Sequence, residues 1–276
     1  MITSASRAAE PVPTPVPDRP LTVMDLADGA FTIMRLRPQT VAIVVAVFVL
    51  PTQLIASYLQ RDVLASLSFD SLNDPNNASF QSPADVIGGS LISSALLYLT
   101  LPFVGVAITH LVKGWKDGTD RSAGECLIFT FRKTPTILAA FIISKLLQTI
   151  TLTFATPFIA SVAPIIGAEQ AGPVTAVRRS VDLTKRRAGP MYGLWVLVVV
   201  VSTLVGAALG QLPNIMPLIL GDWAWIGFFA ATSLVGMVTN VFAVGTAVLA
   251  YFDLRNRLEG HDLSMRTQVL ADAVRD

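Results

Sequence analysis

The chain has 276 residues, of which 53% are hydrophobic and only 14% are charged, and its mean hydropathy is +0.61. Soluble domains carry about 25% charged residues, so a chain this apolar cannot hide its side chains in one core, and lipid is the natural solvent for the excess. The net charge of +1 argues against nucleic acid as a partner, and the single cysteine, Cys126, excludes a disulfide framework and a thiolate metal cluster.

Residues 1–20 are polar and proline-rich, without the hydrophobic run behind a basic start that marks a secretory signal. Such a composition favours extended polyproline II structure and cannot form a core, so we expect a disordered cytoplasmic tail. From Leu21 to Leu36 apolar residues recur with the period of a helix, and Thr22 with Asp25 matches a capping box that would start it. We expect an amphipathic helix that lies in the cytoplasmic interface or packs against cytoplasmic parts of the same chain.

The long apolar stretches predict six crossings, each needing about 20 residues. They are residues 41–58, 86–112, 136–154, 155–168, 191–212 and 226–251. The stretch from Thr136 to Ala168 is too long for one span and short for two, and Pro157 and Pro164 break it. We therefore expect a full crossing to about Phe154, followed by a short return leg that either spans the membrane or is re-entrant.

Three further segments lie between or beyond the crossings. Residues 113–135 are charged and are expected to form a cytoplasmic loop. Residues 172–187 predict a second amphipathic surface helix, because Pro173 suits the first helical position and an apolar stripe follows it. The last crossing is expected to continue as a helix from Asp253 to Glu259, where opposite charges four apart can pair, before Gly260 and a short polar helix.

Orientation follows from the basic residues. Every lysine and arginine except Arg61 and Lys145 falls in residues 1–37, in residues 113–135, in residues 172–187, or after the last crossing at residue 251. We expect these regions, and hence both termini, on the cytoplasmic side of the plasma membrane. Because residues 113–135 and 172–187 are both strongly basic, an even number of passes must separate them, which favours six crossings over five.

Lys145 is expected near the middle of a span, where an ionisable group costs a few kcal/mol on insertion scales. Gln148 and, in the last crossing, Asn240 are the other candidate intramembrane polar residues. No acidic residue lies at the centre of an expected span, so three interpretations of Lys145 stay open. It bonds to carbonyls freed by the broken return leg, it snorkels toward the interface, or it lines a cavity for an anionic headgroup or substrate. For Asn240 we expect an interhelical hydrogen bond.

The 172–187 segment carries a basic cluster that can contact anionic lipid, although orientation alone also explains it. Its members are Arg178, Arg179, Lys185, Arg186 and Arg187. No phosphate loop, nucleophile elbow or His-Glu-x-x-His motif occurs, and His110, His261 and Cys126 lack the spacing of a metal site. We therefore expect no catalytic residue, no metal and no cofactor.

Three stretches resemble a known family. They are Arg19-Pro20-Leu21-Thr22 leading into Asp28-Gly29-Ala30-Phe31 and Arg35 to Pro38; Glu169, Gly172-Pro173 and Arg178-Arg179-Ser180-Val181-Asp182-Leu183-Thr184; and Tyr251-Phe252-Asp253-Leu254-Arg255, Glu259-Gly260 and Asp262-Leu263. Together they resemble the bacterial glycerophosphoryl diester phosphodiesterase membrane-domain family in its stand-alone, actinobacterial form. The resemblance covers residues 19 to about 265 and implies six membrane helices with a cytoplasmic interfacial helix. Because no His-Arg-Gly catalytic signature occurs, it does not imply phosphodiesterase activity.

The sequence therefore predicts an all-α, polytopic transmembrane helical bundle with about six crossings and cytoplasmic amphipathic interfacial helices. Its regions are a tail (1–20), a membrane domain (21–260) and a cytoplasmic C-terminal segment (261–276). We expect a non-enzymatic protein that scaffolds or regulates a membrane partner or lipid, with membrane lipids and a membrane protein as its partners. The alternative is a transporter or lipid translocator that uses a cavity near Lys145. The small-xxx-small pattern from Gly206 to Gly210 favours packing within the bundle over a dimer seam, and it does not predict the oligomeric state.

Overall fold

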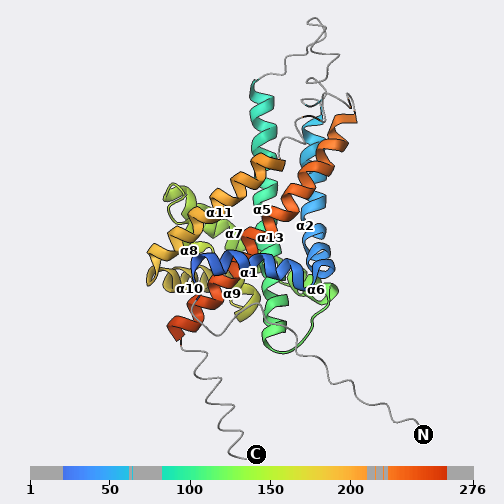
Figure 1. Cartoon of the computed structure of the whole chain (residues 1–276). Coiled ribbons are helices and arrows are strands. Elements are labelled where there is room, and N and C mark those ends of the chain that lie inside the picture. Colours follow the sequence, from blue (N-terminus) through green and yellow to red (C-terminus); the bar gives the residue numbers. More distant parts are fainter. Residues whose placement is uncertain are drawn as a thin grey trace, which may run out of the picture.

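The computed structural model describes residues 21–61, 64, 83–209, 215, 220 and 223–259. Over this part of the chain the regular structure is entirely helical, which confirms the all-α prediction (Figure 1). The predicted tail (1–20) and C-terminal segment (261–276) lie outside the described residues. The helices are α1 (Val23–Leu36), α2 (Pro38–Leu59), α5 (Pro83–Lys116), α6 (Ala123–Arg132), α7 (Thr134–Ile150), α8 (Thr156–Ile159), α9 (Val162–Glu169), α10 (Pro173–Lys185), α11 (Ala188–Leu209) and α13 (Ala224–Glu259).

Among the described residues, four helices are long and apolar enough to cross a membrane: α2, α5, α11 and α13. The pair α6 and α7 adds a fifth only if both count as one span, and they meet at a bend of 65°. These lengths are those of a multi-pass membrane protein, as predicted, but they do not reach the expected six crossings. The difference lies in α7, α8 and α9, which have 17, 4 and 8 residues, each short of the about 20 that a crossing requires.

The two predicted amphipathic helices are present as α1 and α10. At the start of α1 the Thr22 hydroxyl accepts the Asp25 N–H (3.2 Å), and the Asp25 carboxylate accepts the Thr22 N–H (2.9 Å), so the predicted capping box is confirmed. Helix α10 begins at Pro173, as expected. The last long helix continues to Glu259, and Arg257 pairs with the acid four residues earlier.

The segment 113–135, expected to be a loop, contains a helix. Helix α6 begins at a second capping box, formed by Ser122 and Glu125. It is amphipathic, because Cys126 is buried whereas Ile128 and Phe131 on its other face are exposed. The loop prediction was wrong here because the helix has only ten residues and charged residues flank it on both sides. The apolar pattern therefore repeats over too few residues to indicate a helix.

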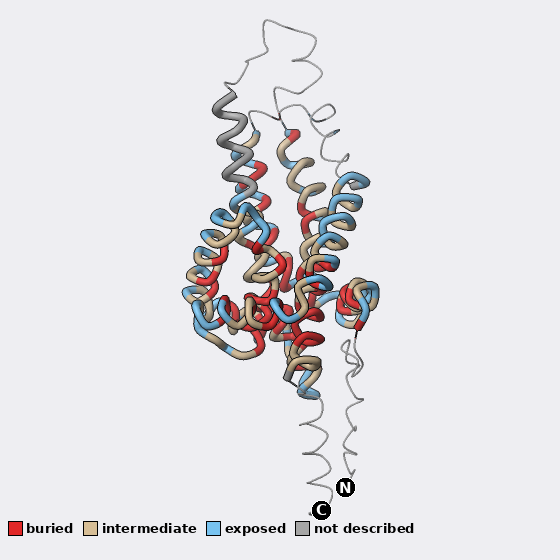
Figure 2. The backbone as a smooth tube through the Cα atoms, turned by 90° about the vertical axis from the view of Figure 1, so that its left-hand side faces the viewer, coloured by how far each residue is buried: buried red, intermediate tan, exposed pale blue. Residues whose placement is uncertain are grey.

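Helix α9 packs closely against the second half of α5. A Cβ atom at Gly105 would lie 2.7 Å from the Ala163 Cβ, and one at Gly167 would lie 2.8 Å from both the Val106 carbonyl oxygen and the Thr109 Cβ. Since both contacts advance along the two helices in the same direction, α9 runs parallel to α5. Figure 2 shows that buried residues gather in the half of the molecule that contains α1, α9 and α10.

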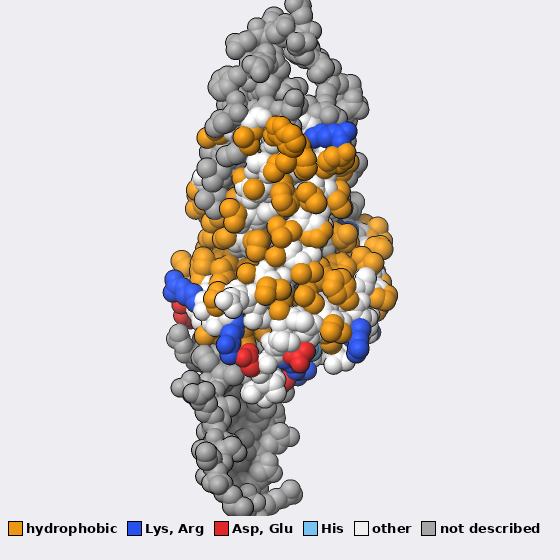
Figure 3. Space-filling view, turned by 90° about the vertical axis from the view of Figure 1, so that its right-hand side faces the viewer, with side chains coloured by type: hydrophobic (Ala, Val, Ile, Leu, Met, Phe, Trp, Pro, Cys, Tyr) orange, Lys and Arg blue, Asp and Glu red, His pale blue; other side chains and the backbone are white. Residues whose placement is uncertain are grey.

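Charged side chains gather at one end of the molecule, which we call the charged end. On the face shown in Figure 3 an apolar belt stands above the acidic and basic groups, and a basic group marks the opposite edge. Polar contacts tie the helices together at the charged end: Lys113 Nζ donates to the Ala168 carbonyl (2.7 Å), and Arg37 pairs with Asp120. The basic residues of the charged end are Arg35, Arg37, Lys113, Lys116, Arg121, Arg132, Lys133, Arg178, Arg179, Lys185, Arg186, Arg187, Arg255 and Arg257.

Candidate functional site

Residues 134–169 form a helical hairpin, which consists of α7, a turn at 151–155, and the returning α8 and α9; we call it the hairpin. Its turn satisfies its own backbone groups. The Thr153 N–H donates to the Gln148 carbonyl (2.8 Å), and threonine hydroxyls of the turn donate to nearby carbonyls. Leu152 and Thr153 have positive φ values of 49° and 70°, the left-handed conformation that closes many helix ends. Internal satisfaction of this kind is what lipid demands of a backbone.

The turn of the hairpin contacts the beginning of α11. The Phe154 carbonyl accepts a hydrogen bond from the Tyr192 hydroxyl (2.7 Å), and the Phe158 and Tyr192 rings meet edge to face with centroids 5.9 Å apart. Tyr192 lies in the second turn of α11, about 6 Å along the axis from Ala188. The turn therefore lies beside the part of α11 that starts at the charged end, whereas a full crossing would carry it about 30 Å away.

The ammonium group of Lys145 faces two aromatic rings. Its Nζ lies 4.4 Å from the centroid of the Tyr98 ring on α5 and 5.6 Å from that of Phe141, one turn earlier on α7. Side chains on a helix point toward its N-terminus, which here leads to the charged end, the direction that snorkelling requires. No carbonyl or carboxylate of a described residue is hydrogen-bonded to Nζ. The structure thus provides cation–π contacts, which none of the three sequence interpretations included.

The three candidate intramembrane polar residues do not form one site. Gln148 Nε2 donates to Thr156 Oγ1 (3.3 Å) and so joins the two legs of the hairpin. Asn240 Nδ2 donates to the Gly236 carbonyl (2.7 Å) within its own helix, in place of the expected interhelical bond. Within the described part of the chain, no hydrogen bond or ion pair joins Asn240 to Lys145 or Gln148.

Some members of the predicted basic cluster on α10 are held by acidic partners. Arg179 Nε donates to Glu169 Oε2 (2.7 Å), and Glu169 Oε1 accepts the Tyr251 hydroxyl (2.8 Å), so this carboxylate joins α9, α10 and α13. Lys185 pairs with Asp182 on the same helix. The hydrogen bond from Lys185, and the charges of Lys185 and nearby arginines, lower the pKa of Asp182 below its ordinary value.

The remaining members of the cluster are available to a ligand. Arg178 and Arg186 are exposed and Arg187 is half-buried. None of these three side chains forms a hydrogen bond or an ion pair with another described residue. Arg178 lies on the exposed face of α10, whose apolar face, including Ala176 and Leu183, is buried, and Arg186 and Arg187 directly follow the end of this helix.

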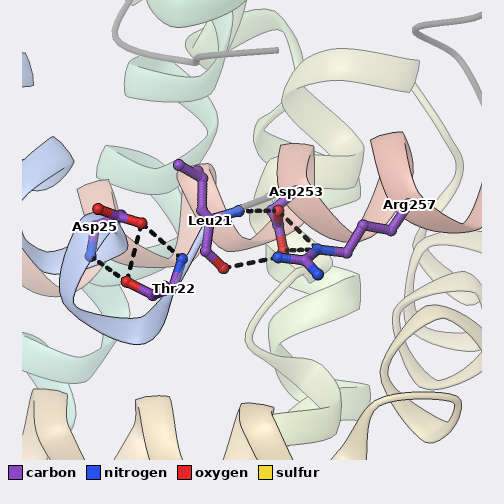
Figure 4. Close-up of polar contacts among 5 residues, drawn as sticks. All are labelled: Leu21, Thr22, Asp25, Asp253 and Arg257. Atoms are coloured by element: carbon purple, nitrogen blue, oxygen red, sulfur yellow. Dashed lines mark hydrogen bonds and ion pairs between the residues drawn. The ribbon is translucent and has the colours of Figure 1, made fainter. Parts of the chain in front are cut away.

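The start of α1 is held by the end of α13, an arrangement that we call the clasp (Figure 4). The buried Asp253 accepts the Leu21 N–H (2.9 Å), and its two carboxylate oxygens accept hydrogen bonds from Arg257 Nε (2.9 and 2.8 Å). Arg257 Nη2 donates to the Leu21 carbonyl (2.7 Å). The capping box of Thr22 and Asp25 follows directly, so the first turn of α1 is fixed at both its backbone and its side chains.

Sequence reasoning did not single out Tyr98 or Tyr192, although both make the contacts that position the hairpin. Tyr192 and its partner Phe154 are 38 residues apart, so no local spacing could reveal the pair. An aromatic residue inside an apolar run also gives no signal of its own, because such residues are common in any membrane helix.

In the described part of the chain, no group of three or more His, Cys, Asp or Glu side chains is placed to hold a metal ion. The available polar groups of the described residues include three cations: Lys145 beside aromatic rings, and Arg178 and Arg186 at the surface. Such groups bind anions through charge-assisted hydrogen bonds. No protein-family model, curated protein or solved structure matches this chain.

Proposed function

We propose that the chain crosses the membrane four times, through α2, α5, α11 and α13, and that the hairpin is re-entrant. The contact between the turn and Tyr192 supports this, as do the short legs of the hairpin. A hairpin that enters from the charged end and returns to it keeps the basic residues before α7 and after α9 on one side. A count of five crossings would place the basic α10 opposite the basic residues 113–133, against the charge rule.

We further infer that the charged end faces the cytoplasm and that the membrane is the plasma membrane. Basic residues flanking membrane helices mark the cytoplasmic side, and in the described residues Arg61 and Lys145 are the only basic side chains away from the charged end. Helices α1, α6 and α10 then lie at the cytoplasmic interface, with the apolar faces of α1 and α10 buried against the protein itself.

Within this topology we propose a non-enzymatic role, in which the charged end binds anionic lipid and so supports or regulates a membrane partner. The observation that carries this is the difference between two sets of arginines. Arg179 and Arg257 are bound to carboxylates of the protein, whereas Arg178 and Arg186 are exposed and unpaired among the described residues. A basic residue near an anionic lipid surface contributes about 1 kcal/mol to binding.

The family resemblance remains a proposal, and one structural observation supports it. The clasp joins the first resembling stretch to the third, and the Glu169 bond to Tyr251 joins the second to the third. These contacts hold the helix ends of the charged end together, which gives the three stretches a shared structural role and a reason to occur together in one family. Because residues 1–276 carry no His-Arg-Gly signature, we expect that this chain, once purified, does not hydrolyse glycerophosphodiesters.

The double variant Arg178→Gln/Arg186→Gln tests the lipid-binding role. Two basic residues contribute about 2 kcal/mol at low salt, so the apparent affinity for phosphatidylglycerol should fall roughly thirty-fold. The measurement is the lipid-dependent rise in melting temperature of the purified chain in an uncharged detergent. Arg178→Lys/Arg186→Lys, which keeps both charges at the same positions, is the control and should respond as the wild type does. An unchanged response of the glutamine variant would contradict the proposal.

A lipid translocator is the second candidate, favoured by the position of Lys145 on a hairpin that does not cross. A cation and the polar Gln148 within the apolar belt would lower the barrier for an anionic headgroup that moves between leaflets. Proteoliposomes with fluorescent phosphatidylglycerol separate the two roles. Accelerated exchange between leaflets that Lys145→Met abolishes would favour translocation, and an exchange rate equal to that of protein-free liposomes would exclude it.

A further inference from the structure

The charge of Lys145 is not matched by any acid that the structure describes. Its ammonium group has three N–H donors, and it makes cation–π contacts with the rings of Tyr98 and Phe141. An aromatic face attracts a cation through its quadrupole but supplies no lone pair to accept a hydrogen bond. A half-buried ammonium in an apolar belt therefore gains strongly from an anion that the protein itself does not provide.

With the charged end at the lipid headgroups, as proposed above, the ammonium group lies within reach of their phosphates. Helix α7 begins at Thr134, next to the basic Lys133, and Nζ of Lys145 reaches back beside Phe141. Phe141 lies about 10 Å along the helix axis from the start of α7. If α7 is tilted, the depth of this position in the membrane is smaller than that distance. Half of the hydrocarbon core is about 15 Å thick, so an anionic headgroup from this leaflet needs only a local displacement.

The position is open to lipid and provides a second donor. Tyr98 is 54% exposed, and its hydroxyl has no hydrogen bond with a described residue. Beside Lys145 on α7, Ile142 and Leu146 are 66% and 62% exposed. The Lys145 cation and the Tyr98 ring therefore meet between α5 and α7, and exposed apolar side chains of α7 lie one turn before Lys145 and directly after it.

We propose that Lys145 and Tyr98 bind the phosphate of an anionic glycerophospholipid from the leaflet at the charged end, with its acyl chains along Ile142 and Leu146. A lysine binds phosphate as a point charge, and the apolar surface beside it fits a lipid rather than a free ion. The inference rests on the proposed lipid-binding role and on the re-entrant hairpin, and it adds a second, deeper site with its own lipid class. The exposed arginines of α10 contact the headgroup layer, whereas Lys145 holds one lipid within the apolar belt.

Lys145→Met is the direct test, with the chain purified in an uncharged detergent and titrated with dioleoyl phosphatidylglycerol or dioleoyl phosphatidylcholine. Charge-assisted hydrogen bonds are the strong ones, so the apparent affinity for phosphatidylglycerol, read from the shift in melting temperature, should fall about tenfold or more. Lys145→Arg should retain it, and Tyr98→Phe, which removes only the hydroxyl, should weaken it several-fold. Thr149→Val is the matched control: the residue is exposed one turn further on, and its hydroxyl donates to the Lys145 carbonyl (2.9 Å).

Salt separates this site from the α10 cluster. At about 0.5 M salt exposed charges are screened within a few ångströms, so the Lys145-dependent shift should persist while the contribution of Arg178 and Arg186 disappears. The α10 double variant should keep the salt-resistant shift, which allows either proposal to fail alone. A wild-type response of both Lys145→Met and Lys145→Gln would overturn the inference. So would an equal shift with phosphatidylcholine, inorganic phosphate or oleate, because each would assign the site to a different occupant.

Discussion

Asp253 shows how one buried carboxylate organises the charged end at the scale of single residues. It accepts hydrogen bonds from the Leu21 backbone and from Arg257, and Arg257 in turn donates to the Leu21 carbonyl. A buried acid with only one of these partners would be costly, but here the carboxylate is satisfied from two sides. The clasp therefore fixes where α1 begins on α13, and it holds the amphipathic helix against the bundle.

Asp253→Asn should release the start of α1. The amide can still accept the Leu21 N–H, but it no longer balances the charge of Arg257, and hydrogen bonds to charged groups contribute about 1.5–3 kcal/mol. Hydrogen exchange measured by mass spectrometry should show faster exchange of the amides of Val23–Leu36 and little change elsewhere. Asp28→Asn, an exposed acid on the same helix, is the control. If exchange in α1 is equally slow in both variants, the clasp does not hold the helix.

At this scale the sequence revealed the residues whose chemistry is local or unusual. The capping box of Thr22 and Asp25 depends on a spacing of three, and a lysine in an apolar run is visible by its charge alone. The partner of Lys145 could not be predicted, because a ring in another helix supplies the contact, whereas the sequence suggested freed carbonyls, snorkelling, or a cavity for an anionic headgroup or substrate. The bond of Asn240 to its own helix was also missed, since both arrangements satisfy an amide equally well.

Among the helices, the contact between α5 and α9 holds the hairpin in place. Glycine at residues 105 and 167 lets the two backbones approach closely, since a Cβ at either position would meet an atom within 3 Å. Small residues at helix interfaces serve this purpose in membranes, where the hydrophobic effect does not drive helices together. The close approach brings α9 back along α5 to the charged end, so these glycines determine where the hairpin ends.

Gly167→Ala should destabilise the hairpin. The new methyl group would lie 2.8 Å from the Val106 carbonyl oxygen, and overpacking of this kind costs about 1–3 kcal/mol. Thermal unfolding in detergent should therefore show a lower melting temperature. Gly189→Ala is the matched control, because nothing lies within 4 Å of its Cβ position in α11, and it should leave the melting temperature unchanged or slightly raised. Equal melting temperatures for the two variants would show that α9 does not pack against α5 in this way.

The sequence predicted a helix correctly where its apolar pattern repeats over enough residues. Helices α1 and α10 repeat apolar residues over 14 and 13 positions, long enough for the helical period to be clear. Helix α6 is shorter and lies among charges, so it was taken for a loop. The sequence predicted both legs of the hairpin, but apolarity is the same in a span and in a re-entrant leg, so the sequence could not predict whether they cross the membrane.

For the whole molecule, the distribution of charge and the contacts of the hairpin answer different questions. The basic residues require that residues 113–133 and 172–187 share a side, and a hairpin that crosses twice or not at all meets that requirement equally. Charge counting therefore could not distinguish six crossings from four. The contact that supports the four-crossing proposal joins the turn to Tyr192, and it depends on tertiary packing that the sequence pattern does not record.

Accessibility of the hairpin turn tests the four-crossing topology most directly. In a Cys126→Ala background, single cysteines at Asn76, Thr153 and Gln170 would be exposed to a membrane-impermeant maleimide in intact cells and after permeabilisation. We predict that position 76 is labelled from outside, that position 170 is labelled only after permeabilisation, and that position 153 is not labelled from outside. Labelling of position 153 in intact cells at the rate of position 76 would show that the hairpin crosses the membrane and would contradict the account.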